Sequence, residues 1–91
     1  MTASLRLPAP LRSTVRGETF VPIQARDLAS LPAAIEARYP ELAARVLVQG
    51  AFGRFVNVFV DGEDVRFLPA DTSLDSARVI ELLPAMSGGG G

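Results

Sequence analysis

The feature that most constrains the fold is a run of alternating side chains in the second half of the chain. In RFVNVFVDGEDVRFLP, valine occupies every second position from 56 to 60, and Phe55, Asn57 and Phe59 lie between the valines. A period of two is typical of a strand whose two faces meet different surroundings. The pattern predicts a strand with its valines on a buried face and its two phenylalanines on the opposite, open face.

The next residues, Asp61-Gly62, form one of the strongest short hairpin signals, because both residues tolerate a positive φ. We therefore expect residues 64–68 to return as the neighbouring strand. Three further short strands are expected from alternation between proline and glycine breakers, at residues 3–8, 19–23 and 78–83. Pro22 lacks a ladder donor, so the second of these strands is expected at an edge of the sheet.

One segment, ARDLASLPAAIEARYPELAARVL, has helical spacing of its leucine and isoleucine residues. Asp27 and Ser30 are both candidate N-caps. We expect a first turn at 28–31 and a regular helix that ends near Arg38, because the residue before Pro40 avoids the α region. Three less regular parts follow from the remaining pattern: a second helical piece at 41–47, a loop at 49–53, and a loop at 69–77 in which Thr72 or Ser73 opens one turn.

The element order is strand, strand, helix, strand, strand, strand, which predicts an α+β domain at residues 1–84. One main helix covers one face of a mixed sheet of four to five strands. The first and last strands are expected side by side and parallel at the centre, which is the β-grasp arrangement. Residues 85–91, AMSGGGG, are expected to be a flexible tail, because ordering glycine costs the most backbone entropy.

The composition excludes several kinds of chemistry. The chain has no histidine and no cysteine, which removes the usual zinc ligand sets, the Ser-His and Cys-His dyads and any disulfide; we expect no catalytic residue and no metal site. All nine basic residues are arginine and the net charge is −1, without a basic run that would favour nucleic acid. No apolar stretch approaches the roughly 20 residues of a membrane span, and no signal-peptide pattern is present. We therefore expect a soluble, cytoplasmic protein with no membrane partner.

The segment RFVNVFVDGEDVRFL and the ending VIELLPAMSGG resemble the ubiquitin-like sulfur carrier proteins, the ThiS and MoaD family. The resemblance runs from Leu5 to Gly89, and its details are most similar to the CysO type, the carrier of a cysteine biosynthesis route. It departs from the family at the end, since family members mostly stop at the Gly-Gly that corresponds to Gly88-Gly89. Gly90 and Gly91 are native residues, residues added by cloning, or residues removed in maturation.

The resemblance implies a carrier that is not itself an enzyme and binds no cofactor. An E1-like adenylating enzyme of the MoeB or ThiF type would use ATP to activate the carboxylate of Gly91 or Gly89, with Gly88 and Gly90 beside it. A sulfurtransferase or another sulfur donor would convert the adenylate to a thiocarboxylate. A synthase would then accept the sulfur; a pyridoxal-phosphate-dependent enzyme of cysteine synthesis is favoured, and molybdopterin, thiamin thiazole and thiolated natural products remain open. A metalloprotease is a further partner if the tail is trimmed.

Four side chains are predicted to bind such partners: Phe55 and Phe59 on the open face, with Leu83 and Met86 extending the patch toward the tail. Packing within the sheet is the alternative role of the two phenylalanines. Two other functions remain open for the whole chain. One is a protein modifier, conjugated to lysines of target proteins through its C-terminal glycine. The other is a plain interaction module with a glycine tail.

Overall fold

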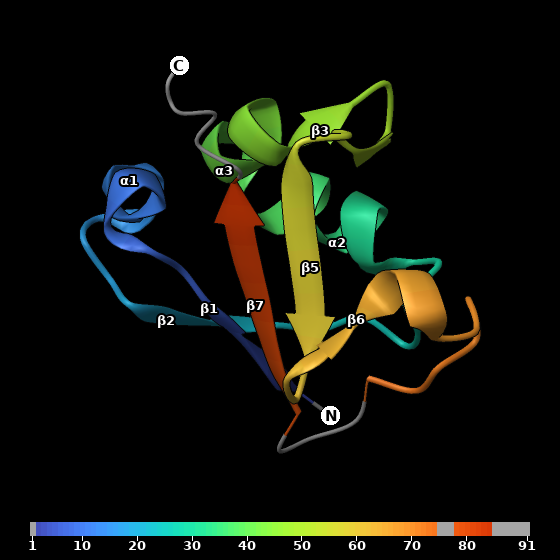
Figure 1. The fold of residues 1–91 in the computed structure, drawn as a ribbon. Helices are drawn as coiled ribbons and strands as arrows, with labels where there is room; N and C mark the ends of the chain where they lie inside the picture. The colour runs from blue at the N-terminus through green and yellow to red at the C-terminus, as the bar shows by residue number, and fades with distance from the viewer. Residues whose placement is uncertain (1, 75–77, 85–91) are drawn as a thin grey trace.

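A five-stranded mixed sheet forms the centre of the protein in the computed structural model, which describes residues 2–74 and 78–84 (Figure 1). Its strand order is β2-β1-β7-β5-β6. The central strand β7 pairs in parallel with β1 and antiparallel with β5, as the expected β-grasp arrangement requires. The strands are β1 (Ala3–Arg6), β2 (Phe20–Ile23), β5 (Val56–Val60), β6 (Glu63–Asp64) and β7 (Val79–Pro84).

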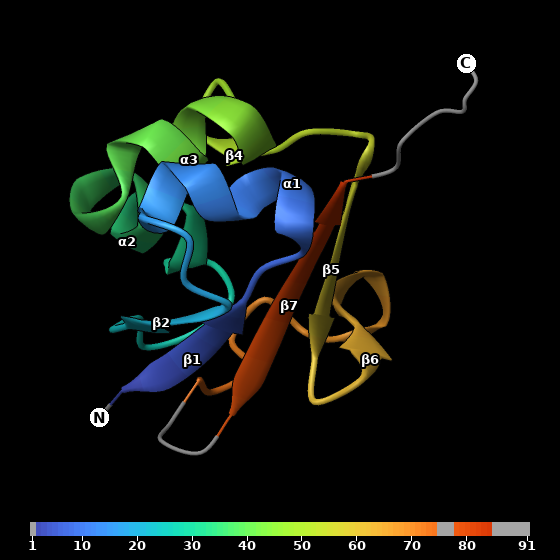
Figure 2. The same cartoon turned by 90° about the vertical axis from the view of Figure 1, so that its left-hand side faces the viewer.

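Helices cover one face of this sheet, as Figure 2 shows from the side. The main helix α2 (Leu31–Arg38) and the shorter α3 (Pro40–Val46) follow each other directly, and a third, α1 (Ala9–Arg12), continues into the 3-10 turn η1 (Ser13–Val15). The α+β class and the helix-on-sheet arrangement are confirmed. Of the three helices in the described residues, α2 and α3 correspond to the expected main helix and to the expected second piece at 41–47, and α1 was not expected. None of the helices in the described part is long and apolar enough to cross a membrane.

The hydrophobic core lies between the sheet and these helices. From the sheet, β5 contributes Val58 and Val60, which are 2% and 0% exposed, and Val56 packs partly buried against the same core. The valine face of the alternating strand therefore points to the helices, as predicted. The fully buried side chains of the other elements come from five parts of the chain: Leu5, Leu7, Leu31, Ile35, Leu42, Val46, Leu74, Ile80 and Leu82.

Prolines mark the ends of elements much as the sequence indicated. The helix α2 ends at Arg38, and Pro40 lies in the first turn of α3. A backbone N–H in the first turn has no acceptor within the helix, so the absence of this group in proline removes no hydrogen bond. Asp27 and Ser30 stabilise the turn that leads into α2, and the Ser30 side chain makes no cap bond to the helix itself. The Asp27 carboxylate accepts the Ser30 N–H at 3.0 Å, and the Ser30 hydroxyl oxygen accepts the Asp27 N–H at 3.2 Å.

The strand β2 is an edge strand, and Pro22 lies within it, as expected. Pro22 has no N–H to offer to a further strand, and its carbonyl already accepts the Tyr39 hydroxyl. Both features block the addition of another chain to this edge, a common protection of exposed strands.

No helix was expected between the first two strands, but residues 9–12 form α1 and residues 13–15 continue it as η1. Pro10 lies in the first turn of this helix, where proline is tolerated. Leu11 and Val15 lie one helical turn apart and are 3% and 6% exposed, so their burial stabilises the turn. The prolines at 8 and 10 fit the end of the first strand, and Pro10 also suits the start of a helix.

The expected returning strand at 64–68 was also wrong beyond its first residue. Only Glu63–Asp64 pair with β5, and Val65–Phe67 form the 3-10 turn η2. The Asp64 carboxylate accepts the Arg66 N–H at 2.9 Å and so caps this turn. Val65 and Leu68, three residues apart, both pack against the core, a spacing that fits one helical turn better than a strand.

Two loops differ in detail from the expectation. The loop at 49–53 contains half of a small hairpin, β3 (Leu47–Val48) with β4 (Ala51–Phe52), whose turn residues Gln49 and Gly50 both have positive φ. In the second loop, Thr72 closes a turn on Pro69, and no helix forms within 69–74. The Asp61-Gly62 hairpin is confirmed, with φ of 50° and 88°.

Candidate functional site

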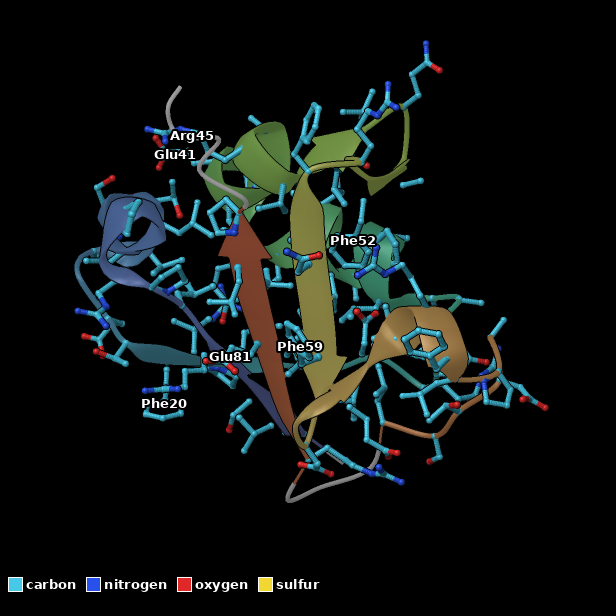
Figure 3. All side chains as sticks on the ribbon, viewed as in Figure 1. Phe20, Glu41, Arg45, Phe52, Phe59 and Glu81 are labelled. Atoms are coloured by element: carbon cyan, nitrogen blue, oxygen red, sulfur yellow. The ribbon has the colours of Figure 1, made fainter. Side chains whose placement is uncertain are left out.

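The sheet face opposite the helices carries one continuous row of side chains across all five strands. Because the strands are in register, each member lies beside the next; from β2 to β6 the row is Phe20, Arg6, Glu81, Phe59 and Asp64. Figure 3 shows three of its members, Phe20, Glu81 and Phe59, spread over the face that points to the viewer. We call this row with its neighbours Asn57 and Leu83 the open face.

Each charged member of the open face is in an ion pair, either with another member or with Arg66 of η2. An Arg6 guanidinium nitrogen donates to a Glu81 carboxylate oxygen at 2.8 Å. At the β6 end, the Arg66 guanidinium donates to Asp64 at 2.7 Å and reaches the Asn57 amide oxygen at 3.4 Å. The hydrogen bonds from Arg66 hold the pKa of the Asp64 carboxyl below its usual range. These pairs leave a surface of apolar side chains set between neutralised charges.

Two of the predicted partner-binding residues, Phe59 and Leu83, lie on the open face. Both are half-buried, and neither belongs to the core between sheet and helices. Leu83 on β7 lies opposite Asn57 on β5, and Phe59 follows Asn57 by two residues on β5, where it lies opposite Glu81. The two side chains are therefore diagonal neighbours, a relation that keeps long side chains within reach of each other.

A third predicted residue, Phe55, is placed differently from the strand pattern. It lies one residue before β5 begins and is 65% exposed, with the Arg54 guanidinium 5.5 Å from the centre of its ring. The remaining predicted site residues, Met86 and the glycines at 88–91, lie outside the described residues. The last described residue of the chain, Pro84, ends β7.

Two exposed aromatic residues were missed. Phe20 is 52% exposed and lies at the β2 end of the open row; the alternation of Phe20 and Pro22 with buried Val21 and Ile23 could have revealed it. Phe67 is 84% exposed in η2. Phe67 is exposed because a turn forms where a strand was expected. The i, i+3 spacing of Val65 and Leu68 was the sequence signal that could have predicted this turn.

A shallow groove of about 320 Å³ opens beside the C-terminal end of β7. Its walls are apolar on two sides, from Leu83 on β7 and from Pro8 and Ala9 at the start of α1. Arg6, Glu81 and Arg12 provide its polar lining. Arg12 is half-buried, and its Nε donates to the Leu7 carbonyl at 3.1 Å, which holds the guanidinium at the groove.

The described residues offer no set of three or more carboxylates that could hold a metal ion. The ionisable side chains in the row across the open face form ion pairs at the surface. The fold, with a parallel β1/β7 pair at its centre and helices on one face, defines a ubiquitin-like β-grasp protein.

Comparison with known proteins then assigns the family. Residues 5–89 match the ThiS family, and the chain belongs to it. The chain is 30% identical over 93 residues to the sulfur carrier protein CysO of Mycobacterium tuberculosis, covering 98% of this chain and 100% of that protein.

Solved structures agree with this assignment. The crystal structure of the Amycolatopsis orientalis BexX/CysO complex contains a chain with a TM-score of 0.79 and 28% identity, covering 96% of this chain and 99% of that one. SAMP1 from Haloferax volcanii has a TM-score of 0.78 at 22% identity, covering 98% and 100%, and shares the fold. The protein is a CysO-like member of a family of small sulfur carriers.

Proposed function

We propose that this protein carries sulfur as a thiocarboxylate on its C-terminal glycine. The observation that supports this most strongly is the full-length similarity to a sulfur carrier protein, together with a family match that extends through Gly89. The glycines at 88–91 are the proposed reactive end. The open face beside the end of β7 is the proposed contact surface for the enzymes that act there.

A terminal carboxylate has a pKa near 3.3–3.7 and is an anion at neutral pH, so it is a poor electrophile. We infer that an E1-like enzyme supplies the activation. A carboxylate oxygen attacks the α-phosphorus of ATP and pyrophosphate leaves, which gives an acyl-adenylate. Sulfide from a donor protein then attacks the acyl carbon, and AMP leaves with the electron pair of the broken C–O bond.

The thiocarboxylate sulfur is the nucleophile that a biosynthetic enzyme would use. The likeness to CysO favours a route to cysteine, with a pyridoxal-phosphate-dependent synthase as acceptor. The absence of cysteine from the chain suits this role, because a thiol on the carrier would exchange with a sulfur donor.

A protein modifier is the second candidate, because an acyl-adenylate can also acylate the amino group of a lysine. This chain contains no lysine, so such a modifier could not extend into branched chains of itself. Its attachment would be limited to other proteins.

Mass spectrometry of the protein purified from its own cells separates these functions. A carrier shows a terminal peptide heavier by about 16 Da, since one oxygen is replaced by sulfur. Covalent adducts to larger proteins would instead identify a modifier. A terminus that remains an unmodified carboxylate while the cells are starved of cysteine would overturn both.

A further inference from the structure

The groove beside the end of β7 holds a cation whose charge no described carboxylate balances. Of the two arginines that line it, Arg6 is already paired with Glu81 at 2.8 Å. Within residues 2–74 and 78–84, no carboxylate lies within ion-pair distance of Arg12. A planar guanidinium held in place by one of its own N–H groups presents its remaining donors in a fixed fork, the geometry that a carboxylate accepts.

The side chains around Arg12 indicate what kind of ligand the groove could bind. Pro8, Ala9 and Leu83 give the groove an apolar wall, and its volume of about 320 Å³ suits one or two side chains and not a folded ligand. Arg12 is half-buried, so a carboxylate that meets it displaces less water than at a fully exposed arginine. The groove therefore fits an acidic side chain with an apolar neighbour.

The position of the groove suggests which protein supplies the acidic side chain and its apolar neighbour. Leu83 lines the groove and precedes Pro84, so the chain leaves the described fold at the groove rim. The seven residues after Pro84 can span at most about 25 Å. Any enzyme that holds the terminal glycine in its active site must bring its surface close to this rim.

We propose that Arg12 binds a carboxylate of the adenylating enzyme, and that this contact positions the carrier for activation. The inference rests on the proposed function and adds a docking residue that lies off the aromatic part of the open face. Arg12 acts on binding and takes no part in the adenylation chemistry.

The test is ATP–pyrophosphate exchange by the adenylating enzyme of the same organism, with the full chain varied in concentration. Arg12→Gln should raise the half-saturating carrier concentration by about tenfold or more, because it removes a charged hydrogen-bond partner of the carboxylate. The maximal rate should stay unchanged, and Arg12→Lys should recover part of the loss. Arg26→Gln, which removes the same charge from an exposed position before α2, is the matched control and should behave as wild type.

A second variant leaves the Arg12 bond to Leu7 intact. Ala9→Glu places a carboxylate in the groove at the first position of α1, where an acidic residue is compatible with the helix. It should compete for Arg12 and raise the half-saturating concentration as well. Raised ionic strength should weaken wild-type binding more than that of Arg12→Gln, since the ion pair is screened.

The outcomes are distinguishable. Wild-type exchange with no change in Arg12→Gln and Ala9→Glu would overturn the docking role and leave the proposed function standing. A lower half-saturating concentration in Arg12→Gln would show that Arg12 holds the chain's own terminal carboxylate, which also overturns the proposal. No exchange by the wild-type chain would overturn the proposed function, and this inference with it.

Discussion

The two faces of the sheet are built from the same strands and differ in almost every property. Leu82 is fully buried against the helices, whereas its neighbour Leu83 is half-buried on the open face. The covered face is aliphatic on the four strands from β2 to β5, and the open face places the Phe59 ring between two ion pairs. The comparison teaches that one alternating pattern builds a buried face that stabilises the fold and an accessible face that we propose as a contact surface for other proteins.

The largest difference in stability is expected when leucine is replaced by alanine on each of the two faces in turn. Leu82→Ala should reduce the free energy of unfolding by about 2–5 kcal/mol, because it leaves a cavity in the core. Leu83→Ala removes the same atoms from the open face and should cost clearly less. Chemical denaturation of both variants measures the difference, and equal losses would show that the two faces are not distinct in stability.

A smaller difference is expected within β5. Val58→Ala should destabilise the protein more than Phe59→Ala, although phenylalanine loses more atoms, because Val58 is 2% exposed and Phe59 lies outside the core. Phe59→Ala should mainly weaken binding to the adenylating enzyme, measured by titration. If Phe59→Ala unfolds at the lower denaturant concentration, the phenylalanine serves packing and not partner binding.

The smallest effect concerns the charges of the open face. Hydrogen bonds from Arg66 lower the pKa of Asp64 in the folded state. Its stabilisation is therefore complete above the ordinary aspartate pKa of about 3.9 and is lost as the pH falls through the lowered value. Asp64→Asn should be slightly less stable than wild type at pH 5–8, and the difference should shrink below about pH 4. A constant difference down to pH 2 would contradict this cause.

The sequence predicted the parts of the fold that depend on regular periodicity. The alternation around Val58, the Asp-Gly hairpin and the apolar spacing of α2 each correspond to one local structure, so they were interpreted correctly. The errors occurred where a residue has two compatible roles. Pro10 can break a strand or begin a helix, and Asp64 can continue a strand or cap a turn. The burial of Leu11 and the packing of Val65 against the core favour the second role in each case.

The site was predictable only in part, for a related reason. Alternation placed Phe59 on the open face, because strand periodicity determines the face of a side chain. The row that joins Phe20, Arg6 and Glu81 depends on the register between strands far apart in the sequence, which no local pattern specifies. The groove at Arg12 also required α1, the helix that the sequence analysis missed.

The central claim, that the protein works through its terminal glycines, is tested most directly by shortening the chain. A chain that ends at Gly89 should support ATP–pyrophosphate exchange at least as well as the full chain if Gly90 and Gly91 are dispensable. A chain that ends at Ser87 should support none, because its reach falls by roughly 14 Å and a side chain occupies the reactive position. Both should melt at the temperature of the full chain. Full exchange by the folded chain ending at Ser87 would contradict the account.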